Sequence, residues 1–255
     1  MKIRDLLCHI NTFAPFELAE EWDNSGLLVG SIGAEVTRIG VCLDAVSEAV
    51  IEAEHQGCNV LVCHHPLIFR PAKRVTDETE QGRTIIEAIR RNIAIIAAHT
   101  NWDKAQGGVN DILAGLIGIK DTEPLGDFGV LCSLPQTVAV KNFAEHVQSS
   151  WGLSHIDVYA KYVLDKVSRA AICGGSGASF WKTAREKGAD VYLTADMKYH
   201  EIIDATKEGL IIALADHGEM ERASIPELSR KISLCGTETV IIGVKALPKI
   251  LSLRV

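Results

Sequence analysis

The chain has 255 residues, of which 47% are hydrophobic, and a formal net charge of −7. This length fits one large domain or two small ones, and we find neither an apolar run long enough to span a membrane nor the pattern of a signal peptide. Lysines and arginines are scattered along the chain, which disfavours direct nucleic-acid binding. Seven cysteines without a Cys-x-x-Cys pair indicate free thiols, and we expect a cytoplasmic protein.

The first half of the sequence predicts helices and strands in alternation. Apolar residues at helical spacing predict a helix over 3–10, and a turn-rich segment follows at 22–26. Glycines close several of the later helices. The further elements that we expect are strands at 27–30, 38–43, 59–63 and 93–98 and helices at 47–56, 81–92 and 109–117.

The second half begins again near residue 121 with the same kind of pattern. A glycine-rich turn at 174–177 follows one strand and opens a helix that runs to about Lys187. Another helix is expected after Asp196. The remaining predicted elements are strands at 129–134, 167–173, 191–194, 210–214 and 239–244 and a helix at 141–150.

Short apolar strands bounded by helices predict an α/β fold whose mixed, largely parallel sheets are covered by helices. The segment 41–62 resembles 171–193, and at one constant offset Gly57 corresponds to Gly188 and Val60 to Val191. We therefore predict an internal duplication with one α/β unit over residues 1–123 and a second over 124–255. Chance similarity between two strand–helix–strand segments is the alternative.

Side chains that bind metals follow three of the predicted strands. If these strands are neighbours in one sheet, three histidines and two carboxylates meet at a single edge, and His99 lies beside them. The candidate metal ligands are His64, His65, Asp103, His217 and Glu221.

The residue types favour two ions rather than one. Neighbouring strand residues point to opposite faces, so His64 and His65 at a strand end suit two adjacent ions. His217 and Glu221 are four residues apart and share one face of a helical turn, which Pro226 keeps short. Imidazole with carboxylate favours zinc, iron, manganese or nickel over calcium and magnesium. Hydrogen-bonded core histidines are the alternative interpretation.

His99 precedes Asp103 by four residues and is the candidate catalytic residue. It could bind a metal, orient a ligand through a hydrogen bond, or carry a proton during the reaction. The glycine-rich turn at 174–177 is either a tight packing turn or a cradle for an anion at a helix N-terminus. The sequence alone leaves both questions open.

In combination, these motifs resemble the Nif-three-like (YbgI-type) family, whose members are labelled GTP cyclohydrolase I type 2 homologues. The resemblance covers essentially the whole chain. It implies two intertwined α/β units and a homohexamer built as a trimer of dimers. It also implies two divalent metal ions per chain, held by His64, His65, Asp103, His217 and Glu221. The motifs that carry it are residues 22–30, 64–69, 99–103, 107–111, 174–177 and 189–194 and the His217/Glu221 pair.

One motif departs from the family pattern. The family has Gly-His-Tyr/Phe-x-Thr-Glu where this chain has Asp-His-Gly-Glu-Met-Glu at 216–221. Both ligand types keep their spacing, but the aromatic residue and the threonine are missing. We therefore expect different surroundings for His217 and Glu221, with Asp216 or Glu219 adding negative charge.

The sequence is most consistent with a metal-dependent hydrolase in which metal-activated water attacks a small-molecule substrate. A cyclohydrolase-like reaction on a nucleotide or a cyclic amide fits this chemistry, although the metal ligands do not identify the substrate. The alternative is a non-catalytic metal-binding scaffold or metal chaperone with protein partners. A substrate screen on metal-loaded protein separates the two functions.

Overall fold

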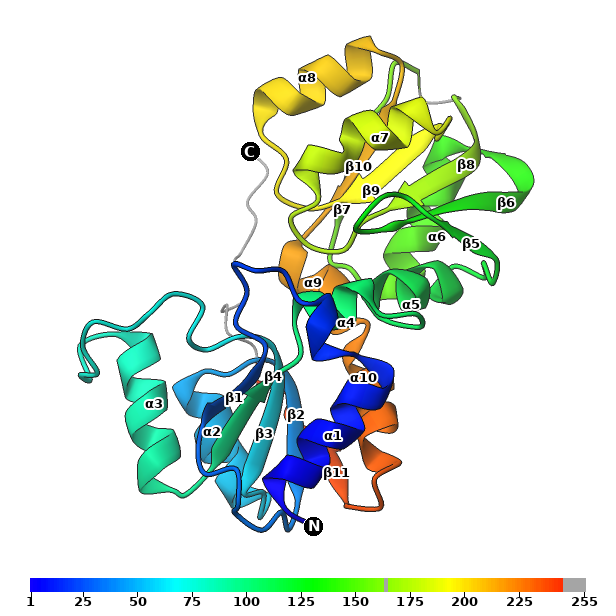
Figure 1. Cartoon of the computed structure of the whole chain (residues 1–255). Helices are drawn as coiled ribbons and strands as arrows, with labels where there is room; N and C mark the ends of the chain where they lie inside the picture. The colour runs from blue at the N-terminus through cyan, green and yellow to red at the C-terminus, as the bar shows by residue number, and fades with distance from the viewer. Residues whose placement is uncertain (163–164, 245–255) are drawn as a thin grey trace. The chain divides into compact units, whose positions relative to one another are not determined.

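The computed structural model describes residues 1–162 and 165–244, and its contacts divide the chain into two compact units (Figure 1). Unit 1 consists of residues 1–102 together with the chain from Ile225 onward, and unit 2 consists of residues 103–224. Unit 1 is discontinuous because the chain leaves it after Trp102 and returns at Ile225. The expected halves 1–123 and 124–255 stay a prediction about the duplication.

Unit 1 contains a five-stranded sheet in the order β1-β4-β3-β2-β11. The four strands from β4 to β11 run parallel, and β1 pairs with β4 in the antiparallel direction. Helices cover both faces, so the central strands are apolar except at the ends of β2 and β3. The strands are β1 Gly26–Val29, β2 Ile39–Asp44, β3 Val60–His65, β4 Ala94–Ala97 and β11 Thr239–Ile241.

The helices of unit 1 form two layers around this sheet (Figure 1). On one face, α2 packs on β2 and β3 while α3 packs on β4 and β1. On the other face, α10 packs on β2 and β11, and α1 packs against α10. The helices are α1 Ile3–Phe13, α2 Ser47–His55, α3 Glu80–Arg90 and α10 Ile225–Ser233, with the short η1 Phe16–Leu18. The short α4 Thr100–Lys104 contains the boundary between units 1 and 2.

Unit 2 contains a six-stranded sheet in the order β5-β6-β8-β9-β10-β7. The three strands β8, β9 and β10 are parallel, and the outer pairs are antiparallel. The strands are β5 Thr122–Pro124, β6 Val130–Ala139, β7 Ile156–Tyr159, β8 Lys166–Ile172, β9 Val191–Thr194 and β10 Ile211–Ala215.

Helices also cover both faces of the second sheet. α5 and α6 lie on one face, and α7 and α8 lie on the other (Figure 1). The short α9 follows β10 and carries both His217 and Glu221. The helices are α5 Val109–Leu116, α6 Val140–Trp151, η2 Ala178–Phe180, α7 Trp181–Glu186, α8 Tyr199–Lys207 and α9 His217–Arg222.

The two sheets repeat one pattern. The order β1-β4-β3-β2 in unit 1 recurs as β7-β10-β9-β8 in unit 2, with the same strand directions. This recurrence is what an internal duplication produces. The mixed α/β fold with helix-covered sheets is confirmed, although only the first sheet is mostly parallel.

Several elements differ from the prediction. β3 continues through His65, where a strand ending at Cys63 is expected from the apolar run. β11 ends at Ile241 rather than at residue 244. The edge strands β5 and β7 were not predicted. Among the described residues, no helix combines the length and apolar character that crossing a membrane requires.

Candidate metal centre

His64 and His65 form the end of β3, and the rest of the fold fixes both rings. Nδ1 of His64 lies 2.8 Å from the carbonyl oxygen of Ala98, and Nδ1 of His65 lies 2.7 Å from the carboxylate of Asp44. A carbonyl or carboxylate oxygen can only accept, so each Nδ1 carries the proton. In a neutral ring, Nε2 therefore keeps the lone pair that a metal ion requires.

Asp44 reaches His65 because the two residues are paired across β2 and β3. Each ends its own parallel strand, which places their side chains at the same edge of the sheet. A carboxylate that holds a histidine in this way is the usual partner of a metal-binding imidazole. Asp44 is not among the predicted site residues, although its place at a strand end is the same signal that identifies His65.

His99 lies two residues beyond the end of β4 and completes a group of three histidines in unit 1. One ring nitrogen of each of His64, His65 and His99 lies within 4.8 Å of those of the other two. The ring centroid of His99 is 5.3 Å from that of His64 and 5.8 Å from that of His65. The three histidines could therefore hold a metal ion together, which places His99 beside the predicted ligands His64 and His65.

Asp23 fixes the orientation of His99. Its fully buried carboxylate accepts hydrogen bonds from Nδ1 of His99 at 2.7 Å and from the hydroxyl of Thr100 at 2.6 Å. Burial raises the pKa of Asp23, but the hydrogen bonds from His99 and Thr100 outweigh that effect and the net pKa lies well below its usual range. The negative charge of Asp23 is thereby retained, and Nε2 of His99 is left as the acceptor nitrogen.

Unit 2 carries the second group of predicted ligands. His217 and Glu221 lie one turn apart on α9, with Nε2 of His217 3.0 Å from a carboxylate oxygen of Glu221. Nδ1 of His217 donates to the carboxylate of Asp196 at 2.6 Å. Asp196 also accepts the hydroxyl of Ser176 and adopts the left-handed backbone, with φ of 55°. His217 thus repeats the arrangement of His65 with Asp44.

Asp103 lies on α4, one residue after the end of unit 1. One of its carboxylate oxygens lies within 4.8 Å of one of Glu221, whose side chain is buried. Burial raises the pKa of the Cys173 thiol to about 12, and the negative charges of both carboxylates also raise it. Unit 2 therefore brings Asp103, His217 and Glu221 together.

The glycine-rich turn supports Glu221 by close packing. Gly175 has φ of +65°, and a Cβ there would lie only 2.2 Å from Oε1 of Glu221. A Cβ at Gly177 would meet the hydroxyls of Thr194 and Tyr192 at 2.5 and 2.6 Å. These close contacts favour the packing-turn interpretation over an anion cradle. The glycines let the backbone pass directly beneath the carboxylate.

The altered motif at 216–221 has a local structural role. The carboxylate of Asp216 accepts the backbone N–H of Glu219 and caps α9. The carboxylate of Glu219 accepts hydrogen bonds from the backbone and the hydroxyl of Ser154. These contacts give both acidic side chains a role in holding α9 in place.

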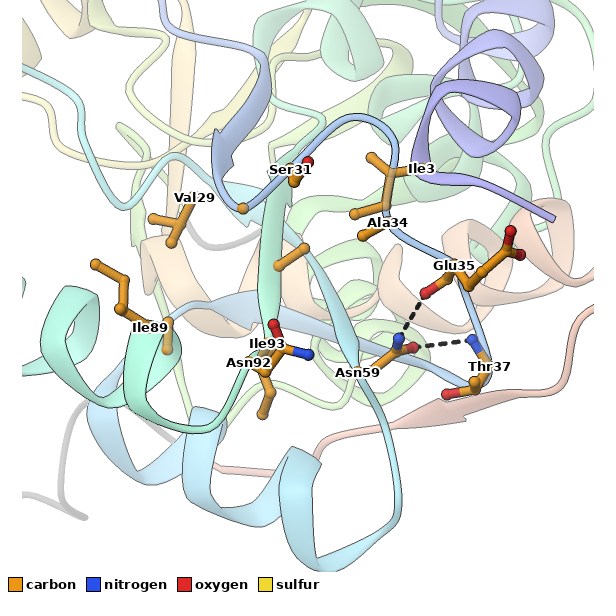
Figure 2. Close-up of a pocket in the computed structure, with 13 residues that line it drawn as sticks. Ile3, Val29, Ser31, Ala34, Glu35, Thr37, Asn59, Ile89, Asn92 and Ile93 are labelled. Atoms are coloured by element: carbon orange, nitrogen blue, oxygen red, sulfur yellow. Dashed lines mark hydrogen bonds between the residues drawn. The ribbon is translucent and has the colours of Figure 1, made fainter.

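Two further features of unit 1 have no part in this group. Cys63 precedes His64, but burial raises its pKa to about 12, so its thiol stays protonated. A cavity of about 390 Å³ lies where β3 and β4 begin (Figure 2), whereas His64 lies near the end of β3. Its polar residue Asn59 is engaged with Glu35 and Thr37, as the dashed lines show.

Comparisons with known proteins identify relatives over most of the chain. A family model described as Duf34/NIF3 (NGG1p interacting factor 3) matches residues 1–248. A Lactococcus lactis protein named GTP cyclohydrolase 1 type 2 homolog is 38% identical over 216 residues, which is 83% of this chain and 84% of the relative. A Clostridium perfringens protein of the same name is 34% identical over 240 residues, 91% of each chain.

The fold is also shared with solved structures. A Bacillus cereus protein related to NIF3 superposes with a TM-score of 0.93 at 24% identity, over 98% of this chain and 99% of the other. This likeness concerns the fold. The match of the family model over nearly the whole length, together with the curated relatives, shows that the chain belongs to the Duf34/NIF3 family.

Proposed function

We propose that this protein is a metal-dependent hydrolase with a two-metal site. The ligands would be His64, His65, Asp103, His217 and Glu221. One observation carries the proposal: each of the three histidines donates its Nδ1 proton to a protein oxygen, as metal-binding imidazoles do. Two such ions would polarise the bond under attack and activate a water molecule.

The charges of the two groups suit divalent cations. Asp103 and Glu221 supply two negative charges directly, and Glu221 is almost fully buried with His217 as its neighbour. A buried carboxylate next to an imidazole is costly unless a cation or a proton accompanies it. Asp44 and Asp196 place further negative charge behind the ligand histidines. The donor set favours zinc, iron, manganese or nickel.

His99 has the geometry of a catalytic base beside such a site. Because Nδ1 donates to Asp23, Nε2 is the nitrogen that can accept a proton from the attacking water. Asp23 keeps this tautomer and stabilises the ring when it becomes positively charged. This is the role that a buried carboxylate has behind a general-base histidine.

The substrate would be a small molecule. The curated relatives are named homologs of GTP cyclohydrolase 1 type 2, so the hydrolytic opening of a nucleotide ring or of a cyclic amide is the reaction that we would test first. We also propose a cytoplasmic homohexamer, a trimer of dimers. Light scattering and sedimentation of purified protein would measure its mass.

The metal proposal is tested by elemental mass spectrometry on untagged protein beside Glu221→Gln. We expect about two transition-metal ions per chain in the wild type and fewer in the variant. Glu219→Gln on the same helix is the control and should keep both ions, because the amide oxygen can still accept the hydrogen bonds from Ser154. A wild type that binds no transition metal after reconstitution would exclude the site.

Turnover separates an enzyme from a scaffold. A screen of nucleotides, cyclic amides and phosphodiesters on metal-loaded protein should find a hydrolysis that chelation abolishes. Stable metal binding with no turnover across the screen would instead support a metal-binding scaffold or chaperone.

A further inference from the structure

Trp22 is exposed in a way that the other tryptophans are not. Its side chain is 57% accessible, whereas Trp102, Trp151 and Trp181 are at most 5% accessible. Phe69 is 41% exposed and packs against it edge to face, with ring centroids 5.8 Å apart. Two large apolar rings therefore share one patch of surface in unit 1.

The backbone on either side of this patch is firmly held. Asp23, next to Trp22, is the buried carboxylate that binds His99 and Thr100. The side-chain amide of Asn24 donates to the carbonyl of Ile68, which ties the turn to the segment that carries Phe69. The two rings thus stand on anchored backbone, and rings that are already held lose little freedom on binding a ligand.

The patch borders the group of three histidines. The ring centroid of His99 lies 6.4 Å from that of Trp22 and 6.2 Å from that of Phe69. His99 also lies against His64 and His65, with ring centroids 5.3 and 5.8 Å away. A molecule resting on the two aromatic rings would therefore be next to the proposed metal site.

Positive charge follows Phe69 along the chain. The guanidinium carbon of Arg70 lies 6.0 Å from the centroid of the Phe69 ring. The segment 67–76 also contains Lys73 and Arg74 and has no acidic residue, in a chain whose net charge is −7. All three basic side chains are exposed. The surface beside the rings therefore suits an anionic group.

We propose that Trp22 and Phe69 bind the planar, heteroaromatic ring of the substrate and that Arg70 binds an anionic group attached to it. This inference rests on the proposed function and narrows it to one substrate class, an anionic compound with a flat ring. Stacking recognises the π-face that all such rings have, so any nucleotide can probe the patch. Arginine in turn suits a phosphate or carboxylate.

The test uses the fluorescence of Trp22. Subtracting the emission of Trp22→Phe from that of the wild type isolates this tryptophan from the three buried ones. We expect AMP to quench the isolated signal saturably in metal-free and metal-loaded protein. Adenosine should bind more weakly, and ribose 5-phosphate should leave the signal unchanged.

Variants then separate the contribution of ring stacking from that of the contact with the anionic group. Phe69→Leu should weaken AMP binding by about tenfold, in line with the contribution of one stacking ring. Arg70→Gln should weaken AMP but leave adenosine unchanged. Tyr199→Leu and Arg90→Gln, which remove an exposed ring and an exposed cation elsewhere, are the controls and should bind AMP normally.

Several outcomes would overturn the inference. These are the absence of saturable quenching by AMP, equal binding of ribose 5-phosphate, or unchanged binding in Phe69→Leu. Protection of Trp22 from acrylamide, with a lower oligomeric mass in Phe69→Leu, would show instead that a second copy covers the patch. The fluorescence test needs neither a bound metal nor turnover. AMP binding can therefore be found even if the protein binds no metal, and metal binding can be found even if AMP does not bind.

Discussion

The carboxylate of Asp44 lies 2.7 Å from Nδ1 of His65 because the two residues are paired at the ends of adjacent parallel strands. A hydrogen bond from Nδ1 to a carboxylate also links His217 to Asp196 and His99 to Asp23, although these carboxylates come from other parts of the chain. Three histidines beside the candidate site thus share one kind of support. This support fixes which nitrogen of each ring is available to a metal.

Asp44→Asn should weaken metal binding without unfolding the protein. The amide can still accept from His65, but it lacks the charge that makes the imidazole a stronger ligand. We expect metal affinity to fall roughly 10- to 100-fold, the usual cost of losing such a partner. Competition with a fluorescent chelator measures this. Asp77→Asn, at an exposed position of the same unit, should keep wild-type affinity, and equal affinities in the two variants would contradict the role of Asp44.

Gly175→Ala should affect metal binding more than stability. The new Cβ would lie 2.2 Å from Oε1 of Glu221 and 3.3 Å from Nε2 of His217, so the carboxylate has to move. The end of a glutamate side chain can shift at little cost to the fold, but it then leaves its position as a ligand. We expect metal affinity to fall about tenfold or more.

Gly209→Ala is the matched control for Gly175→Ala. Gly209 has φ of +87°, and a Cβ there would meet nothing within 4 Å. Both variants pay a similar backbone cost of about 1 kcal/mol for the left-handed conformation. Titration of metal into both proteins, with urea unfolding of each, separates that shared cost from the displacement of Glu221. Normal affinity in Gly175→Ala would show that Glu221 does not need this position.

Much of this fold could be predicted because its strands are short, apolar and buried on both faces. The edge strands β5 and β7 were missed for the opposite reason. Each is only partly buried, and the partner of β7 lies more than fifty residues further along the chain. The return of α10 and β11 to the first sheet was also invisible. Pairing between distant segments leaves no local pattern to detect.

The same reasoning applies to the candidate site. The predicted ligands stand at strand ends or one helical turn apart, so local spacing was enough to propose them. Asp23 and Asp196 act through hydrogen bonds to residues 76 and 21 positions away. Turn-forming aspartates are common, and nothing in the turn at 22–26 distinguished Asp23 from an ordinary Asx turn. Only the folded chain shows which histidine each carboxylate supports.

Metal should stabilise the folded protein, because the unfolded chain cannot gather the ligands. At a free metal concentration of one hundred times Kd, the gain in unfolding free energy should be about 2.7 kcal/mol per ion. Thermal unfolding with increasing zinc or manganese measures it. Glu221→Gln should lose most of the gain while Glu219→Gln retains it. An identical rise in Tm for both variants would place the bound metal elsewhere.

Glu80 gives a prediction about pH that is independent of the metal. Hydrogen bonding from the Ser47 backbone N–H is the largest influence on this carboxyl, opposed by burial and aided by the Ser47 hydroxyl, Arg83 and Thr84. Together they lower its pKa to about 2. Because the pKa is lowered on folding, the stabilisation is complete above the ordinary value of about 4.3 and is lost as the pH falls towards 2. Glu80 thus caps α2 from the start of α3.

Glu80→Gln should therefore lower the free energy of unfolding at pH 7 by about 1 kcal/mol, a modest figure because the side chain is 44% exposed and screened by solvent. Urea unfolding at intervals from pH 7 to pH 3 should show the difference from wild type shrinking below about pH 4. Glu78→Gln, two residues away at an exposed position, should change stability by less than about 0.5 kcal/mol at every pH. A gap between Glu80→Gln and wild type that stays constant down to pH 3 would mean that the charge of Glu80 does not stabilise the fold.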